Sequence, residues 1–343
     1  DKAIDTALQI LNIPRTIMSS MDYSALLRQS LFSATSHPRT AGLAQLEAFK
    51  QSMSQKRFDE WFYDIKEHPR YEMMQKSGLF IADPHDPRLS AKEEAFMNNL
   101  AEKIPIAGKL IKGSERAYVG TLNKMRVDLF NRFADRYEAQ GKTMENNPEF
   151  YKELSNYINN STGRGKLGFM EAAAPVLNSL FFSPRLIASR INLMTMWANP
   201  RTYTQVPKEV RVMYMKDMAK FLALGVSTLI IAKALGADTE NDPRSSDFGK
   251  IKVGNTRWDI WGGFQPYARV MSQVISGERK TTTKGEIQEL NGKGFMQQNR
   301  FTPLGSFARG KLAPVPATVL DLATGRDASG QLVTVQSELL SDV

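Results

Sequence analysis

The helical spacing of apolar residues along most of the 343-residue chain is the strongest constraint on its fold. Residues three and four positions apart share one face of an α-helix, so this spacing predicts amphipathic helices that bury one side. Proline residues at Pro14, Pro38 and Pro69 mark points where a helix begins or ends. The pattern is carried by Ala3, Leu8, Ile10 and Leu11 and then by Ala44, Leu46, Phe49, Met53, Phe58, Trp61, Phe62 and Ile65. We therefore expect a mostly α fold built as a multi-helix domain.

Two segments give more specific helix predictions. Residues Gly113–Gln140 read as one long amphipathic helix, in which mixed arginine and aspartate residues form a solvated face. Further upstream, Ser90 followed three residues later by Glu93 is a capping box, which is typical of a helix start.

A single β-hairpin is expected at residues 249–263. The runs KIKV and TRWDIW alternate in the manner of strands and flank a two-residue Gly-Asn turn. The following segment is rich in glycine and basic residues and is interrupted by prolines, so we expect an extended carboxyl-terminal arm. This gives three regions: an amino-terminal helical region at 1–162, a basic apolar helical region with the hairpin at 163–268, and an extended basic arm and tail at 269–343.

Two strongly apolar segments must either pack or insert, namely Leu177–Trp197 and Phe221–Ala237. The second contains Lys233, and its uncharged part is shorter than the about 20 residues needed to cross a hydrocarbon core of about 30 Å. We favour a buried helix, and insertion into a membrane is the alternative.

The formal charge of +9 is concentrated towards the carboxyl end. Residues 1–162 are nearly neutral, whereas residues 269–326 hold nine cations against four acids. Residues 163–216 hold two acids, Glu171 and Glu209, against eight cations: Arg164, Lys166, Arg185, Arg190, Arg201, Lys208, Arg211 and Lys216. Such an imbalance suits a polyanion, an anionic membrane or an acidic partner, although a plain solvated surface explains it equally well.

The composition argues against several classes of enzyme. No cysteine is present, which excludes disulfides, thiolate metal sites and a cysteine nucleophile. Only three histidines occur, His37, His68 and His85, and each lies beside or one step from a proline. No nucleophile elbow, zinc-protease motif or dinucleotide fingerprint is found. We expect no catalytic residue, no metal and no cofactor.

The loop INNSTGRGKLG at 158–168 resembles a phosphate cradle at first sight. It fails as a nucleotide-hydrolysis loop because Leu167 stands where a serine or threonine must bind magnesium, and Asn160 replaces the first glycine. Arg164 and Lys166 beside backbone donors could still hold one phosphate, including one of DNA. A flexible turn between helices explains the same glycines, and we favour the turn.

Further cations are candidate contacts to nucleic acid or to a partner. Arg185 and Arg190 lie on a helix that begins at Pro184, where they could grip phosphate or pair with acids such as Asp22 or Asp128. On the hairpin, Arg257, Trp258 and Trp261 could contact bases, although alternating aromatics more often form a packed face. The candidates in the arm are Arg300, Arg309 and Lys311.

Three carboxylates near the hairpin, Asp242, Asp247 and Asp259, raise the question of a shared cation. Their spacing matches no calcium-binding loop, so we interpret them as turn-capping residues.

Seven segments in order resemble the large polyvalent protein-associated domain family, a helical domain near the carboxyl end of very large phage polypeptides. They are LNIPRTIMSSMDYSALLRQS, EEAFMNNLAEKIP, SERAYVGTLNKMR, INNSTGRGKLG, APVLNSLFFSPRLIASRIN, DPRSSDFGKIKVGNTRWDIWGGFQPY and KLAPVPATVLDLATG. The resemblance covers nearly the whole chain, and its most specific blocks are SPRLIASR and DPRSSDFGKI. It transfers no catalytic residue.

The resemblance implies a structural role in a phage internal virion or ejection protein. The expected partners are portal, tail or other internal virion proteins and DNA bound without sequence preference, in an oligomeric assembly. The expected location is the virion, inside the capsid or at the portal and tail, and then the host cell envelope or cytoplasm after ejection. Because the chain begins at Asp1 without an initiator methionine, we also expect it to be part of a longer polypeptide.

Two other functions stay open. The chain could insert into the host inner membrane as part of a conduit for genome delivery. It could also be an antirestriction or DNA-modifying module of a polyvalent protein, but that function needs a catalytic cluster, and none was found in the sequence.

Overall fold

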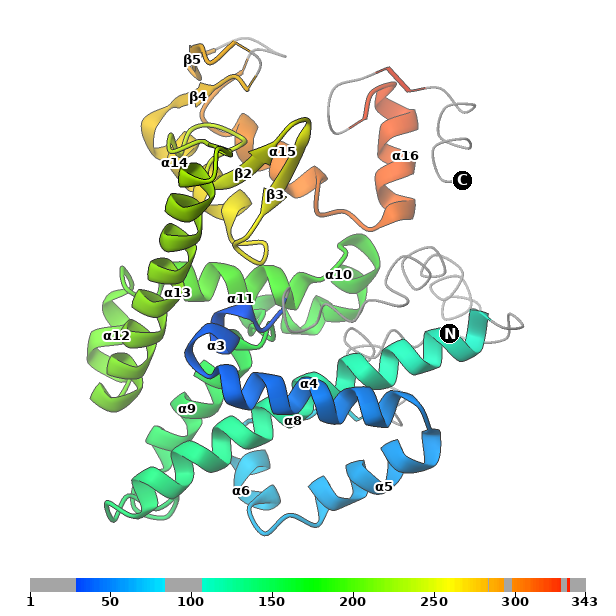
Figure 1. Ribbon diagram of the computed structural model, residues 1–343, viewed down its shortest axis with the longest axis vertical. Helices are drawn as coiled ribbons and strands as arrows, with labels where there is room; N and C mark the ends of the chain where they lie inside the picture. The colour runs from blue at the N-terminus through cyan, green and yellow to red at the C-terminus, as the bar shows by residue number, and fades with distance from the viewer. Residues whose placement is uncertain (1–28, 84–106, 283, 293–297, 328–331, 334–343) are drawn as a thin grey trace. The chain divides into compact units, whose positions relative to one another are not determined.

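The computed structural model describes residues 29–83, 107–282, 284–292, 298–327 and 332–333 (Figure 1). The chain forms two compact units: the first comprises Asp1–Asn178 and Ser183–Leu224, and the second comprises Ser179–Phe182 and Gly225–Val343. This division differs from the three regions expected from the sequence. The predicted capping box at Ser90 and Glu93 lies outside the described residues.

All the regular elements in the described part of the first unit are helices, as the apolar spacing predicted. Its elements are α3 (Leu31–Ser36), α4 (Pro38–Ser52), α5 (Gln55–Lys66), α6 (Tyr71–Lys76), α8 (Ala107–Glu138), α9 (Pro148–Ser161), the 3-10 helix η2 (Gly168–Ala173), α10 (Ala174–Leu180), α11 (Pro184–Thr195), α12 (Pro200–Gln205) and the first part of α13 (Lys208–Ala234). The long helix expected at Gly113–Gln140 is confirmed as α8.

Small residues bring α4 and α8 together, and these helices run side by side in Figure 1. Ala41, Ala44 and Ala48 form the buried face of α4. A methyl group added at Gly120 of α8 would already touch the side chain of Ala48 at 3.4 Å. Larger apolar residues of α8, among them Leu122, complete the core, and each full burial contributes about 1.5–3 kcal/mol. The backbones therefore approach closely because neither helix carries bulk at the crossing.

The larger apolar residues of α4 lie on its outer side. Leu43, Leu46 and Phe49, and Met53 directly after the helix, are between 51% and 62% exposed. The sequence pattern had placed Leu46, Phe49 and Met53 on the packed face, and this prediction was wrong, because alanines occupy the helix crossing instead.

The apolar segment Phe221–Ala237 lies mainly in α13, and its packing differs from the expected buried helix. Phe221 is buried, but Leu222, Leu224, Val226, Ile230 and Ile231 are between 48% and 64% exposed. None of the helices in the described part of the chain has the length and apolar character needed to cross a membrane.

The second unit combines short strands with helices. The elements are β1 (Asp238–Thr239), β2 (Lys250–Val253), β3 (Thr256–Asp259), α14 (Gln265–Ser276), β4 (Glu278–Lys280), β5 (Ile287–Glu289), α15 (Thr302–Arg309) and α16 (Pro314–Thr324). The predicted hairpin is confirmed: β2 pairs antiparallel with β3, and Val253 faces Thr256 across the Gly-Asn turn. The sequence missed β1, which adds a third strand to this sheet.

The described part of residues 269–343 folds into helices and a second antiparallel pair, β4 and β5, instead of an extended arm. Pro303 and Pro314 lie in the first turns of α15 and α16. Proline is favoured at these helix positions, so residues that looked like helix breakers in the sequence are helix starts in the structure.

Candidate anion-binding site

A pocket in the first unit gathers cations from two helices, and we call it the basic pocket. It has a volume of about 430 Å³. Its walls come from α8, from α13 and from the junction between α3 and α4. The lining residues are Ser36, His37, Arg132, Phe133, Arg136, Tyr137, Glu209, Val212, Met213, Lys216, Asp217 and Lys220.

The cations of the basic pocket form two pairs. Arg132 and Arg136 lie four residues apart on α8, and Lys216 and Lys220 lie four residues apart on α13. This spacing places each pair on one face of its helix, one turn apart. All four side chains are exposed, and none of them forms an ion pair with a carboxylate in the part of the chain that the structure describes.

Nearby charges are already paired, which distinguishes these four cations from their neighbours. Lys124 binds Asp128 at 2.6 Å, and Arg70 binds Asp135 at 2.6 Å. At the edge of the basic pocket, Lys142 hydrogen-bonds the carboxylate of Glu209 and thereby lowers the pKa of that carboxyl group. The acids closest in sequence to Arg132 are thus used elsewhere.

The wall on the α13 side holds a buried polar group around Asp217, which is 3% exposed. The hydroxyl of Tyr157 on α9 donates to Oδ2 of Asp217 at 2.5 Å, and Nε2 of His37 lies 3.4 Å from the same oxygen. Burial disfavours the ionised carboxylate, but the close contact with His37 and the hydrogen bond from Tyr157 outweigh burial, and the pKa of Asp217 is lowered. Burial, followed by the charge of Asp217, raises the pKa of Tyr157 well above its usual value.

These features suit the binding of an anion. The lining contains four cations against the two carboxylates Glu209 and Asp217, and each carboxylate has its own partner within the protein. Arginine offers a planar fork of donors that can hold a phosphate bidentately, and lysine adds a mobile positive charge. The arrangement favours charge-based binding.

Three of the sequence-predicted contacts are interior residues. Arg164, Arg185 and Arg190 are 7%, 8% and 1% exposed. Arg164 stacks on Phe80 with its guanidinium carbon 3.6 Å from the ring centroid, and Arg185 pairs with Glu171. A DNA duplex is too large to reach side chains enclosed by the fold, so these arginines do not serve as its surface contacts.

The glycine loop at 159–168 uses its backbone donors internally. The amides of Gly163, Arg164 and Gly165 donate to the carbonyls of Asn160, Asn159 and Arg185. A Cβ at Gly165 would lie 2.2 Å from the backbone nitrogen of Ser189, so this glycine allows the loop to pack against α11. The turn interpretation therefore describes the loop, and Lys166 is its exposed cation.

The hairpin candidates differ from one another. Trp258 is 59% exposed, whereas Arg257 is held by Asp247 at 2.6 Å. The indole nitrogen of Trp261 donates to the carbonyl of Gly249 at 2.8 Å. Trp261 thus packs within the second unit, and Trp258 presents its ring to solvent.

The remaining candidates also differ in their surroundings. Arg300 is exposed. Arg309 binds Asp321 at 2.5 Å, and the amine of Lys311 lies over the rings of Tyr267 and Phe307 at 5.5 and 5.2 Å. These three cations lie in the second unit, and each has different surroundings.

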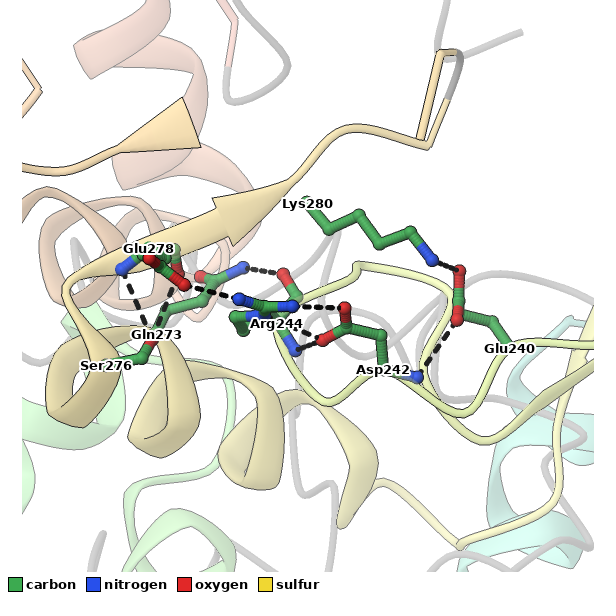
Figure 2. A network of polar contacts seen from close by, with 7 residues as sticks. All are labelled: Glu240, Asp242, Arg244, Gln273, Ser276, Glu278 and Lys280. Carbon is green, nitrogen blue, oxygen red and sulfur yellow. Dashed lines mark hydrogen bonds and ion pairs between the residues drawn. The ribbon is translucent and has the colours of Figure 1, made fainter. Parts of the chain in front are cut away.

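The segment around Asp242 forms an ion-pair network (Figure 2). Arg244 pairs with Asp242 at 2.8 Å and also with Glu278 of β4, while Lys280 binds Glu240 at 2.6 Å. Asp247 binds Arg257, and Asp259 accepts from the amide of Trp261 at 2.8 Å. The three aspartates therefore have separate partners in turns and ion pairs, as the turn-capping interpretation predicted.

Sequence reasoning missed the basic pocket because its cations come from distant segments. Asp128 and Asp135 flank Arg132 in sequence, and this mixture of charges suggested a solvated helix face. A search for basic pairs four residues apart would have found both Arg132 with Arg136 and Lys216 with Lys220, but not their meeting across a pocket.

No family model, curated protein or solved structure matches this chain. The resemblance to phage polyvalent proteins therefore stays a prediction.

Proposed function

We propose that this chain is a non-catalytic docking segment of a phage internal virion or ejection protein, and that the basic pocket holds backbone phosphates of packaged DNA. The observation that carries the proposal is the meeting of four exposed cations from α8 and α13 without carboxylate partners among the described residues. The sequence resemblance supports the phage setting. In that setting, portal, tail or other internal virion proteins are the proposed protein partners.

The physical mechanism is charge neutralisation without sequence readout. Each phosphate that a cation neutralises releases condensed counterions, which lowers the logarithm of the binding constant by about 0.9 per tenfold rise in salt for duplex DNA. Four cations that reach the backbone should therefore give a slope of up to about −3.6. Base-specific contacts are not required.

The test reverses the four pocket cations in one variant, Arg132→Glu, Arg136→Glu, Lys216→Glu and Lys220→Glu. All four side chains are exposed, so the helices should still fold. We expect the variant to lose duplex binding in a fluorescence anisotropy titration over a salt series, and its salt slope to approach zero.

A matched control separates the pocket from net charge. Lys50, Lys56, Lys76 and Lys152 are exposed lysines outside the pocket, and their reversal to glutamate changes the charge by the same amount. Binding should fall much less in this control. Equal losses in both variants, or undiminished binding by the pocket variant, would contradict the proposal.

A second candidate function is adsorption to a membrane, which the exposed apolar side chains of α13 favour. Leu222, Val226 and Ile230 lie four residues apart and are 48–64% exposed, and Lys216 and Lys220 precede them on the same helix. Apolar side chains beside lysines suit the surface of an anionic bilayer.

Flotation with vesicles distinguishes the two functions. If the membrane function is correct, the chain should float with vesicles containing phosphatidylserine, and Leu222→Ser with Val226→Ser and Ile230→Ser should return it to the soluble fraction. Recovery of the unaltered chain only in the soluble fraction would count against the membrane function and leave the DNA proposal standing.

A further inference from the structure

A second pocket in the first unit has a different chemistry, and we call it the amide pocket. It has a volume of about 330 Å³ and lies between α9, the loop after α9, α11 and α12. Its polar lining includes five side-chain amides and one carboxylate, Glu153; the amides are those of Asn156, Asn160, Asn192, Asn199 and Gln205. Glu153 accepts a hydrogen bond from Asn156 at 3.3 Å. Its size lies at the lower end of the range of small-molecule sites, about 300–1,000 Å³.

Hydrogen bonds within the protein fix part of this amide lining. Asn160 donates to the backbone carbonyl of Asn156 at 2.8 Å and accepts from the amide nitrogen of Asn192 at 2.9 Å. Asn160 is buried, with 6% of its surface exposed, whereas Asn192 and Gln205 are exposed. The hydrogen bond to Asn160 therefore fixes the side chain of Asn192 at the base of the pocket.

Two cations stand beside the amides. Lys166 follows the glycine loop, and Arg201 lies in the first turn of α12. Both are exposed, and neither forms an ion pair with a carboxylate in the described ranges of the chain. The pocket can thus offer positive charge at the same ligand that its amides hydrogen-bond.

The apolar part of the lining comes from Leu193, Met196, Val206 and the ring of Tyr157. The Tyr157 hydroxyl is engaged by Asp217 of the basic pocket, so this side chain contributes mainly its ring to the amide pocket. A flat heteroaromatic ring can pack on such a surface, as nucleobases do on aromatic and apolar side chains.

We propose that the amide pocket binds a nucleotide, with the base among the amides and the apolar side chains and the phosphate at Lys166 and Arg201. The amide nitrogen of Asn192 is bound to Asn160, so Asn192 offers its carbonyl oxygen, while Gln205 offers both a donor and an acceptor. Such groups complement the edge of a nucleobase. Arginine and lysine complement the phosphate. The site is separate from the basic pocket and does not depend on the DNA function proposed above.

Isothermal titration calorimetry tests the proposal with the four deoxynucleoside 5′-monophosphates, the matching deoxynucleosides and inorganic phosphate. At least one monophosphate should bind. Its nucleoside and inorganic phosphate should each bind more weakly, by a factor of about ten or more. Failure of all four monophosphates to bind would overturn the proposal, and so would equal affinity for the nucleoside.

Two double variants separate the contribution of the two cations to binding from that of the amides. Lys166→Glu with Arg201→Glu should remove the preference for the monophosphate over the nucleoside. Asn192→Ala with Gln205→Ala should weaken the monophosphate about tenfold and leave the weak binding of inorganic phosphate unchanged. These four residues are exposed, so the fold should survive, and circular dichroism checks it.

Two controls keep the outcome specific. Arg39→Glu with Lys152→Glu carries the same charge change outside both pockets and should bind as the unaltered chain does. The variant with all four cations of the basic pocket reversed should also retain the nucleotide. Loss of nucleotide binding in either control would show that net charge, not the amide pocket, is responsible.

Discussion

Arginine has two different roles in this protein, depending on whether its side chain is buried or exposed. Arg126 is fully buried, where it donates to the hydroxyl and the carbonyl of Thr162 at 2.8 and 3.2 Å. Arg190 is 1% exposed and donates to the carbonyl of Gln29. Charged side chains remain inside a protein only where hydrogen bonds compensate their lost hydration. These arginines cross-link the interior, and Arg132 and Arg136 face solvent.

Glycine at position 165 gives a prediction at this scale. A Cβ there would lie 2.2 Å from the backbone nitrogen of Ser189 and 2.6 Å from the carbonyl carbon of Ala188. We expect Gly165→Ala to lower the free energy of unfolding by about 1–3 kcal/mol, because the loop must move away from α11. Urea denaturation followed by circular dichroism measures the change.

Gly42 provides the control for this substitution. It lies inside α4, and nothing comes within 4 Å of an added Cβ. Gly42→Ala should stabilise the protein by about 0.5–1 kcal/mol, because alanine loses less backbone entropy in a helix. Equal effects of the two substitutions would show that Gly165 has no special packing role.

At the scale of elements, the sequence predicted those features that depend on residues close together in the chain. The spacing in Gly113–Gln140 predicted α8, and the Gly-Asn turn predicted the pairing of β2 with β3. The exposed side of α4 was not predictable, because its cause is the contact of Ala48 with Gly120, which lies far along the chain. For the same reason, the sequence showed many basic residues but not which of them remain unpaired.

The turn at Asp242 gives a pH-dependent prediction. A hydrogen bond from Arg244 lowers the pKa of Asp242 from 3.8 to about 2. A carboxyl group whose pKa is lowered by folding stabilises the protein above its unfolded pKa, and this contribution is lost as the pH falls through the folded value. The contribution of Asp242 should therefore be complete above about pH 4 and disappear towards pH 2.

Comparison of the unaltered chain with Asp242→Asn isolates this group from the other carboxylates. The melting temperatures should differ at pH 7 and converge between about pH 4 and pH 2, because protonation abolishes the ionised form that the variant lacks. Asp64→Asn, at an exposed aspartate, is the control and should show no such convergence. A difference that is constant across this range would refute the role of the ion pair.

At the scale of the whole molecule, α13 belongs to both units, because the division falls between Leu224 and Gly225. Directly after this point, Gly225 packs against Trp261: an added Cβ would lie 2.2 Å from two atoms of the indole ring. The indole is also held by its hydrogen bond to Gly249. Trp261 thus ties the end of α13 to the sheet of the second unit.

Because of this contact, we predict that a substitution can destabilise the second unit and leave the first unit folded. Gly225→Ala should displace the indole and reduce protection from hydrogen exchange in β2, β3 and α14, while α4 and α8 keep theirs. Ser227→Ala, at an exposed position of the same helix, should alter neither region. Equal loss of protection in α4 and α8 would mean that the two units unfold as one.

The close crossing of α4 and α8 also has an evolutionary consequence. Since a Cβ at Gly120 would touch Ala48 at 3.4 Å, a bulkier residue on either helix removes space from the other. We therefore expect positions 120 and 48 to covary, so that a larger residue at one is accompanied by a smaller residue at the other. Descendants of a common ancestor would keep the sum of the two side-chain volumes nearly constant, even after the solvent-facing leucines of α4 have diverged.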